Sequence, residues 1–214
     1  MCNVYEPSSR DRINHRFLLP VPEVPYRAKL GPWGKGPFIR ASGEGRECVF
    51  GQWGLISPFA SQPIDRRFMT NNARSETVHS KPTFRQAWAK GQRCLIPADS
   101  YDEPCWESGV NVWWSFRRRD GQPWALAGLW NDWVDPATGE VHPSYTMLTM
   151  NCDGHELLGR MHKPDPNLPP DAQDKRTVIP LQQDRWEAWL HGSVADAKQA
   201  LQVPALALFD AAPR

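Results

Sequence analysis

The sequence predicts an α+β fold: one domain with a mostly antiparallel, barrel-like or bifurcated β-sheet and short flanking helices. The 214 residues include 21 prolines, which is too many for long helices because proline interrupts a helix interior. The segments with strand-like patterns are also not separated by regularly spaced helices, as a parallel doubly wound sheet would require. The chain length is typical of a single domain.

Prolines dominate the early part of the chain, so we expect residues 1–45 to be irregular. Two apolar segments, 48–53 and 93–97, have the short length and flanking turn residues of buried strands. Between them the pattern predicts a helix. Thr83 caps its start, Gln86 completes a capping box, and a Lys-Gly pair ends it.

A β-hairpin is predicted next. Residues 110–117 alternate between apolar and polar, Asp120 and Gly121 are typical of a type I′ turn, and 124–130 forms the returning strand. The remaining predicted elements are a strand at 145–150, a short helix from Asp153 capped with Glu156, a strand at 177–181, and amphipathic helices at 184–190 and 195–201.

The longest predicted loop is the proline-rich segment 163–174. Too little chain follows it for an independent domain. We therefore predict one domain over residues 1–214, in which 163–174 is an inserted loop and 182–214 is a C-terminal helical segment.

The charge and the cysteine content exclude several classes of protein for this chain. The net charge of +1 argues against a protein that coats DNA by bulk electrostatics, although short Arg and Lys runs allow a local basic groove. The five cysteines are odd in number and include no C-x-x-C, so we expect neither a disulfide framework nor a metal site. No long apolar segment or signal peptide is present, which predicts a cytoplasmic protein with no membrane association.

Cys2 directly follows Met1. Removal of Met1 would leave Cys2 with a free α-amine and a thiol on adjacent carbons. An α-amine has an ordinary pKa near 8, so a usable fraction is neutral and can condense with an aldehyde to a Schiff base. The thiol can then add to the imine carbon and close a thiazolidine ring. The alternative interpretation is an ordinary cysteine early in the chain.

Four motifs extend this observation, and they occur in a fixed order. They are Met1-Cys2-Asn3, Trp53-Gly54-Leu55-Ile56, Asn72-Ala73-Arg74-Ser75-Glu76-Thr77 and Arg93-Cys94-Leu95-Ile96-Pro97-Ala98-Asp99-Ser100-Tyr101-Asp102-Glu103. Together they resemble the SOS response-associated peptidase (SRAP) family of abasic-site processing proteins. The resemblance extends from residue 2 to about residue 181.

The resemblance implies that Cys2 senses abasic sites in single-stranded DNA and forms a covalent thiazolidine crosslink after (auto)proteolytic removal of Met1. The residues that it implies are catalytic Cys2, Glu103, His162 and Asn72, and DNA-binding Arg74, Trp53, Phe59, Pro32 and Arg176. Glu103 would be the general acid/base and His162 a second one, while Arg74 would bind a phosphate. We expect no cofactor, a monomer, and association with the nucleoid when the protein is on DNA.

The histidine assignment leaves one competitor. His162 precedes Arg176-Thr177-Val178-Ile179-Pro180, which is similar to the tail that follows the family's histidine, with 163–174 inserted between them. His155 lies seven residues earlier and is the alternative. The sequence also departs from the family pattern at five positions, namely Val4, Phe59, Ser100, Asp102 and Pro104.

Two other functions stay open at this point. The first is a thiol peptidase or amidase that acts in trans, with Cys2 as nucleophile and His162 as base. The second is a non-catalytic module that binds single-stranded DNA through tryptophans and arginines. In either case Trp53 and Phe59 have an alternative interpretation as core residues.

Overall fold

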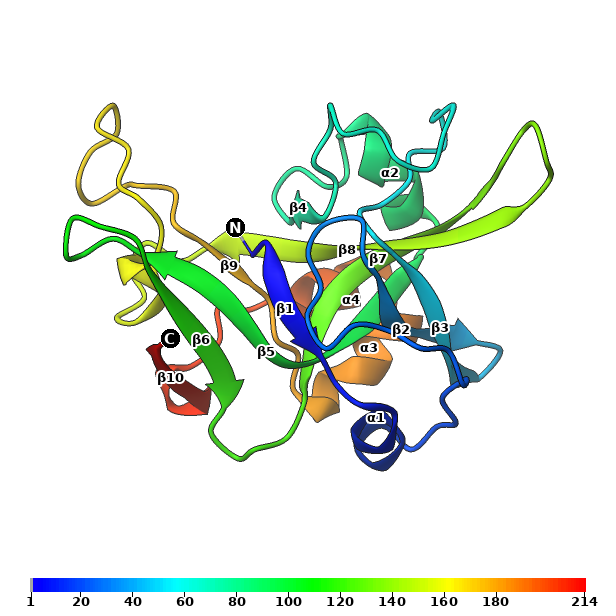
Figure 1. The fold of residues 1–214 in the computed structure, drawn as a ribbon, viewed down its shortest axis with the longest axis horizontal. Coiled ribbons are helices and arrows are strands. Elements are labelled where there is room, and N and C mark those ends of the chain that lie inside the picture. The colour runs from blue at the N-terminus through cyan, green and yellow to red at the C-terminus, as the bar shows by residue number, and fades with distance from the viewer. Residues whose placement is uncertain (1) are drawn as a thin grey trace.

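Five strands of the computed structural model, which describes residues 2–214, close into a barrel (Figure 1). In the order in which they pair, they are β2 (Lys35–Ser42), β3 (Gly45–Trp53), β8 (Val141–Asn151), β7 (Trp124–Val134) and β5 (Arg93–Cys105), which returns to β2. Only the β3–β8 pair of this ring is parallel. The predicted α+β, mostly antiparallel barrel is confirmed.

Further strands extend the barrel. They are β1 (Val4–Pro7) on β5, β6 (Val112–Arg118) on β5, β10 (Phe209–Pro213) on β6, and β4 (Asn72–Arg74) and β9 (Arg176–Val178) on β8. The α-helices are α1 (Arg10–Phe17), α2 (Pro82–Ala89), α3 (Trp186–His191) and α4 (Val194–Ala200). Short 3-10 turns lie at η1 (Leu158–Arg160), η2 (Gln183–Arg185) and η3 (Leu206–Leu208).

Strand β5 organises the fold because it is long enough to pair with different strands along its two parts. Its first part, up to Ala98, pairs with β7, and its last part, from Tyr101, pairs with β6. Strand β1 pairs with the same last part from the other edge, with Tyr5 opposite Tyr101. The end of β5 is therefore fixed on both sides, which makes it a rigid platform for side chains.

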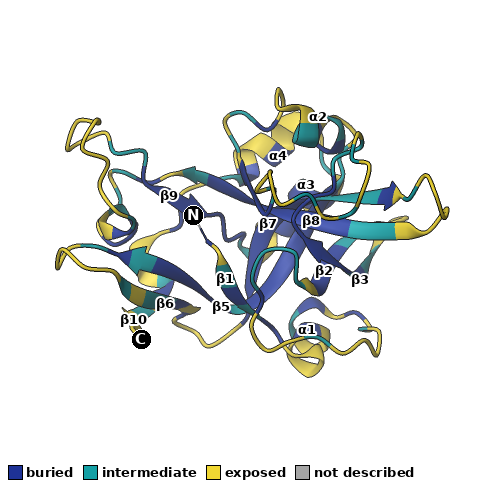
Figure 2. Cartoon of the chain, turned by 45° about the horizontal axis from the view of Figure 1, so that its top comes forward, coloured by how far each residue is buried: buried dark blue, intermediate teal, exposed yellow. Residues whose placement is uncertain are grey.

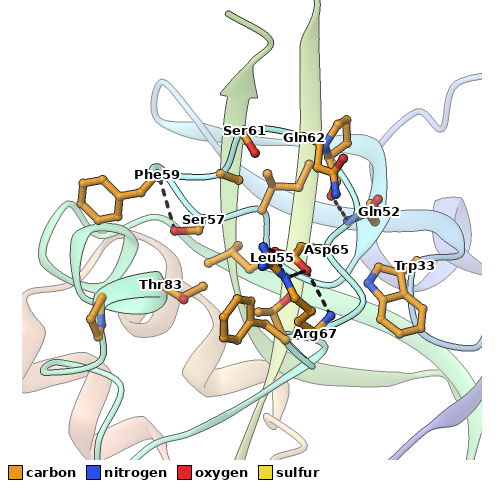
Figure 3. Close-up of a pocket in the computed structure, with 16 residues that line it drawn as sticks. Trp33, Gln52, Leu55, Ser57, Phe59, Ser61, Gln62, Asp65, Arg67 and Thr83 are labelled. Carbon is orange, nitrogen blue, oxygen red and sulfur yellow. Dashed lines mark hydrogen bonds and ion pairs between the residues drawn. The ribbon is translucent and has the colours of Figure 1, made fainter.

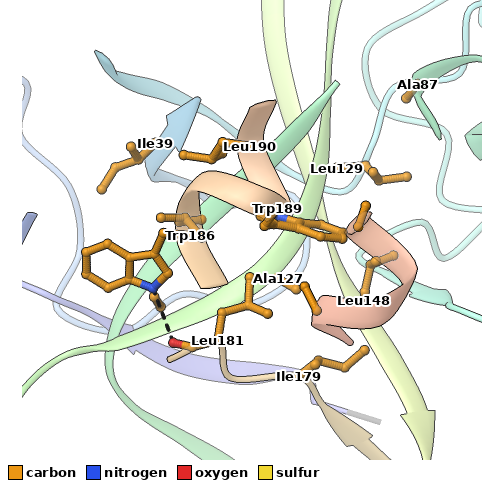
Figure 4. Packing of buried hydrophobic residues seen from close by; sticks show 14 of the residues in the cluster. Ile39, Ala87, Ala127, Leu129, Leu148, Ile179, Leu181, Trp186, Trp189 and Leu190 are labelled. Carbon is orange, nitrogen blue, oxygen red and sulfur yellow. Dashed lines mark hydrogen bonds between the residues drawn. The ribbon is translucent and has the colours of Figure 1, made fainter. Parts of the chain in front are cut away.

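The core has two parts. Inside the barrel, large aromatic side chains such as Trp53, Tyr101 and Tyr145 are fully buried. Outside it, α3 covers the strands through Trp186 and Trp189, and α4 packs into the same cluster through Ala197 and Ala200 (Figure 4). The indole of Trp189 also donates a hydrogen bond to the Cys94 carbonyl (2.8 Å), which joins α3 to β5. Figure 2 shows that the barrel strands are buried while the loops at both ends are exposed.

The predicted hairpin is wrong. Gly121 does adopt a left-handed conformation (φ 70°) in a turn between β6 and β7. The two strands, however, pair with different parts of β5 and not with each other. The sequence predicted the turn correctly. The pairing of β6 and β7, however, is determined by the long strand β5.

Other expectations also needed correction. The first 45 residues are not irregular, since they contain β1, α1 and all of β2. Helix α2 begins at Pro82 without the side-chain cap predicted from Thr83, and the helix predicted from Asp153 is only a turn followed by η1. The segment 182–214 contains α3 and α4, but it ends in strand β10.

Candidate functional site

The candidate site lies where the start of β1 meets the end of β5. Val4 is paired with Asp102, so Cys2, two residues before Val4, lies beside the last residues of β5. Both ribbon views place the start of β1 near β9, at one end of the barrel (Figures 1 and 2). The Cys2 side chain is fully buried, and its Sγ donates a weak hydrogen bond to the Val4 carbonyl (3.4 Å).

Two neighbouring asparagines hold the backbone of Cys2. The Nδ2 atoms of Asn72 and Asn71 donate to the Cys2 carbonyl at 2.7 and 3.2 Å. Asn72 begins strand β4, which is fixed by parallel pairing with β8, and the Trp53 indole donates to the carbonyl of the preceding Asn71 (2.9 Å). Asn72 was predicted for the site, whereas Asn71 was missed because it precedes the motif. Its position beside Asn72 was the one available signal.

Glu103 supplies a buried carboxyl group to the same place. Its burial, together with the negative charge of Asp102, raises the pKa of Glu103 to about 7. The negative charge of Glu103 in turn helps burial to raise the pKa of the Cys2 thiol, because the two groups are close. A carboxyl that titrates near neutral pH is present as both acid and base, which is the property of an efficient general acid/base catalyst.

His162 approaches Glu103 from the other side, with 3.4 Å between His162 Nε2 and Glu103 Oε2. The same Nε2 is 2.9 Å from the Arg176 carbonyl, which accepts only, so Nε2 carries the proton and Nδ1 is the basic nitrogen. Burial lowers the pKa of His162 to about 4, which keeps the imidazole neutral.

The backbone of His162 is held in an unusual conformation. Its φ is 64°, in the left-handed region that non-glycine residues seldom adopt. Two hydrogen bonds fix it: its N–H donates to the Pro104 carbonyl (2.6 Å), and its carbonyl accepts from Lys175 Nζ (2.6 Å). A strained backbone that its surroundings fix in this way is common at functional sites.

The ring of His155, the competing histidine, forms hydrogen bonds with backbone groups. Its Nδ1 accepts hydrogen bonds from the amides of Leu157 and Leu158, both at 3.1 Å, and its Nε2 lies 2.9 Å from the Pro204 carbonyl. Nδ1 therefore stabilises the local turn, and Nε2 connects this turn to the C-terminal segment. Of the two candidates, His162 is the one in contact with Glu103.

The two predicted DNA-binding arginines differ in exposure. Arg74 is half exposed and pairs with Asp174 (2.7 Å), so its guanidinium can still reach solvent. The side chain of Arg176 is only 6% exposed and is held by Glu76 (2.6 Å) and Asp174 (3.2 Å). The carbonyl of Arg176 contacts the site through its hydrogen bond with His162.

The residues predicted to stack on bases also differ in exposure. Trp53 is fully buried and packs edge-on against Tyr5 (4.9 Å between ring centroids), so it has no free face for a base. Phe59 is 65% exposed and projects from the loop that lines a cavity of about 500 Å³ (Figure 3). Pro32 is half-buried beside Trp33, whose ring carries the Arg66 guanidinium at 5.0 Å. Nothing in the sequence singled out Trp33.

Among residues 2–214, no group of His, Cys, Asp and Glu side chains has the arrangement of a metal site. All five cysteines are buried and carry free thiols. No helix in the described part of the chain has the length and apolar character needed to cross a membrane.

Comparison with known proteins gives consistent results. The family model described as SOS response associated peptidase (SRAP) matches residues 2–211. The abasic site processing protein YoqW of Bacillus subtilis is 31% identical over 161 residues, which cover 72% of this chain and 68% of YoqW. The abasic site processing protein HMCES of Xenopus tropicalis is 28% identical over 132 residues, which cover 52% of this chain and 38% of HMCES.

Solved structures show the same fold. A crystal structure of a protein from Bordetella bronchiseptica covers 100% of this chain and 99% of its own, with 35% identity and a TM-score of 0.86. A second structure, from Bacteroides thetaiotaomicron, has a TM-score of 0.81 at 22% identity, over 99% of this chain and 91% of its own.

Proposed function

Because the chain belongs to the SOS response associated peptidase (SRAP) family, we propose that it processes abasic sites in single-stranded DNA by forming a covalent crosslink through Cys2. The observation that carries this proposal is the convergence at the end of β5. There the Asn72 amide holds the Cys2 backbone, and Glu103 lies between Cys2 and His162. The names of the relatives, which are abasic site processing proteins, support the substrate.

The reaction needs protons to move at two atoms. The α-amine of Cys2, once Met1 is removed, attacks the aldehyde carbon of the open-chain sugar, and the resulting hydroxyl leaves as water. Glu103 donates the proton to that hydroxyl and takes one from the nitrogen, as its pKa of about 7 allows. The Cys2 sulfur then adds to the imine carbon, and its proton passes to the nitrogen. The net change is the loss of one water.

The raised pKa of the thiol suits this order of events. Burial keeps the Cys2 sulfur protonated, so it does not compete with the amine as an anionic nucleophile before the imine forms. The same feature argues against a thiol peptidase acting in trans, because that enzyme class needs a stabilised thiolate.

His162 has the chemistry for the preceding step. An abasic sugar is mostly a closed ring, and its opening requires removal of a proton from the anomeric hydroxyl. The neutral imidazole of His162 offers Nδ1 as the base, since Nε2–H is held by the Arg176 carbonyl. Glu103, in its acid form, would protonate the ring oxygen.

Removal of Met1 can use the same groups. In our proposal Glu103 takes the thiol proton as the Cys2 sulfur attacks the Met1 carbonyl carbon, and returns it to the Cys2 nitrogen as the peptide bond breaks, so that no thiolate accumulates. Water then hydrolyses the thioester and releases methionine. This step consumes one water and leaves the α-amine that the crosslink requires.

The test is a crosslinking assay with protein whose N-terminal Cys2 has been verified by intact mass. The protein is incubated with an oligonucleotide that contains one abasic site, and the mixture is heated and run on a denaturing gel. We expect a heat-stable shifted band whose mass is the sum of both partners less one water. Cys2→Ala should abolish the band, whereas Cys48→Ala, which removes another buried thiol, should keep it. A wild-type protein that gives no band would refute the proposal and leave a non-catalytic binding module.

A further inference from the structure

A second cavity, of about 580 Å³, adjoins the candidate site. It lies between the segment that follows β5 and the loop 163–174, which occupy the same end of the molecule in both ribbon views (Figures 1 and 2). Its walls include Trp106, Pro164, Pro166, Leu168, Pro170 and His162. Because His162 lines this cavity and also contacts Glu103, the cavity lies next to the proposed reaction centre.

Hydrogen bonds within the loop 163–174 hold the part of it that lines the cavity. Gln173 Nε2 donates to the carbonyls of Leu168 (3.0 Å) and Pro169 (2.8 Å), and Gln173 Oε1 accepts from the Asp165 amide (2.7 Å). At the end of the loop, the Asp153 carboxylate accepts from two successive backbone amides at 3.0 and 2.7 Å. Since these bonds fix the loop from both directions, the cavity is formed before any ligand arrives, which reduces the cost of binding.

The charged side chains around the cavity have partners. Arg160 forms a two-point ion pair with Glu107 (2.6 and 2.8 Å), Lys175 Nζ donates to the His162 carbonyl, and Lys163 Nζ lies 5.1 Å from the centroid of the Trp106 ring. The remaining surface is mostly prolines, Leu168 and the half-buried ring of Trp106. Such a lining favours a flat, largely apolar group, with cations close to its edge.

We propose that this cavity binds the nucleobase next to the abasic sugar, unpaired and packed against Trp106 and Leu168. The inference rests on the function proposed above, because an abasic sugar at Cys2 would place its neighbouring nucleotide within reach of His162. The volume lies in the range of about 300–1,000 Å³ typical of small-ligand sites. A base in this cavity cannot remain in a duplex, so the loop 163–174 would itself select single-stranded DNA at that nucleotide.

The experiment separates base binding from crosslinking. Two single-stranded oligonucleotides carry a tetrahydrofuran abasic analogue, which has no aldehyde, with 2-aminopurine as its 5′ or its 3′ neighbour. We expect the wild-type protein to change the fluorescence of one of the two. Trp106→Ala should remove that change and weaken binding by roughly 5- to 150-fold, the effect of losing one base–aromatic stack. Leu168→Asp should act in the same direction, because it places a charge in the cavity.

The matched control is Trp113→Ala, which removes another tryptophan close to the end of β5, 40% exposed and outside this cavity. It should leave both the fluorescence change and the affinity as in the wild type. If Trp106→Ala and Leu168→Asp bind both oligonucleotides like the wild type, the cavity proposal is overturned even where crosslinking to a natural abasic site succeeds. A fluorescence change that depends on Trp106 without any crosslinking would instead retain the cavity and reject the proposed chemistry.

Discussion

Replacement of Glu103 by glutamine should stabilise the protein at alkaline pH while it removes the activity. Burial raises the pKa of this carboxyl from its ordinary value of 4.5 to about 7. A group with a raised folded-state pKa holds its proton in the folded protein at pH values where the unfolded chain has released it. Stability therefore falls as pH rises through the interval between about 4.5 and 7, and the loss is complete above it.

The size of the effect follows from the same two values. A tenfold change in an ionisation equilibrium is worth about 1.4 kcal/mol, so ionised Glu103 lowers the free energy of unfolding by about 3 kcal/mol at pH 8. Glutamine has nearly the same shape and no charge. For a chain of this size, relief of that penalty should raise Tm by about 5–10 °C at pH 8 and leave it unchanged below pH 4.5.

The assay is thermal unfolding of wild type and Glu103→Gln from pH 4.5 to 8, with the difference in Tm plotted against pH. The difference is the useful quantity because other groups titrate in the same range. Burial raises the pKa of Asp102 to about 6 and lowers that of His162 to about 4, and these two act on stability in opposite directions. The crosslinking rate of the variant should fall by about 10²–10⁴-fold.

One result would refute this reasoning. A Glu103→Gln protein that is less stable than wild type at pH 8 would show that the ionised carboxylate is fully compensated by its neighbours. Glu103 would then be a structural anion and not a group that titrates near neutral pH, and its role as both acid and base in the proposed chemistry would lose its basis.

Three further predictions concern other parts of the molecule. Asn72→Ala should slow crosslinking at least tenfold, because one of the two amides on the Cys2 carbonyl is lost, and lower stability by only about 1 kcal/mol in urea unfolding. Arg74→Ala should weaken DNA binding and reduce its salt dependence by about one ion, whereas Arg176→Ala should reduce stability and crosslinking with the salt dependence of DNA binding unchanged. Trp189→Ala should cost about 3–5 kcal/mol in the same urea assay, against less than about 0.5 kcal/mol for exposed Trp113→Ala.

The sequence predicted those parts of the site that lie within continuous motifs. Asn72 and Glu103 each lie in a matching segment, and the structure brings both close to Cys2. Asn71 and Lys175 were not predicted, because their roles depend on which backbone carbonyl reaches them after folding. No local pattern encodes that kind of contact.

The prediction of the fold was also limited by contacts that no local pattern encodes. The segment around Asp120 and Gly121 has the composition of a hairpin turn, and a turn forms there. The strands on either side nevertheless pair with β5, which supplies longer-range partners for both. Proline content was equally misleading in the first 45 residues, because most of those prolines lie in the connection between α1 and β2 and leave both elements intact.

Two of the residues predicted to contact DNA are buried. Trp53 and Arg176 belong to motif regions, and a motif does not reveal whether a side chain faces the ligand or supports a residue that does. In the structure Trp53 holds the Asn71 carbonyl, and the Arg176 carbonyl holds the His162 ring. Both residues therefore affect the site indirectly, because each holds a residue that lines it.

The three departures from the family pattern within β5 lie on one face of that strand. Side chains alternate along a strand, so Ser100, Asp102 and Pro104 share one face, whereas Tyr101 and Glu103 share the other. Val4, a further departure, is paired directly opposite Asp102 and so belongs to the same face. The divergence has therefore left the face that carries the proposed chemistry unchanged.

The divergent face is instead built from charges. Asp102 lies 3.2 Å from Arg214 and 3.8 Å from Lys29, and Glu6 pairs with Arg117 (2.8 Å) and with Arg214 (2.6 Å). An aromatic side chain at position 102 would remove the carboxylate that Arg214 and Lys29 share with Glu6. Since the negative charge of Asp102 also helps to raise the pKa of Glu103, this outer network can adjust the pH at which the inner face works without contacting the substrate.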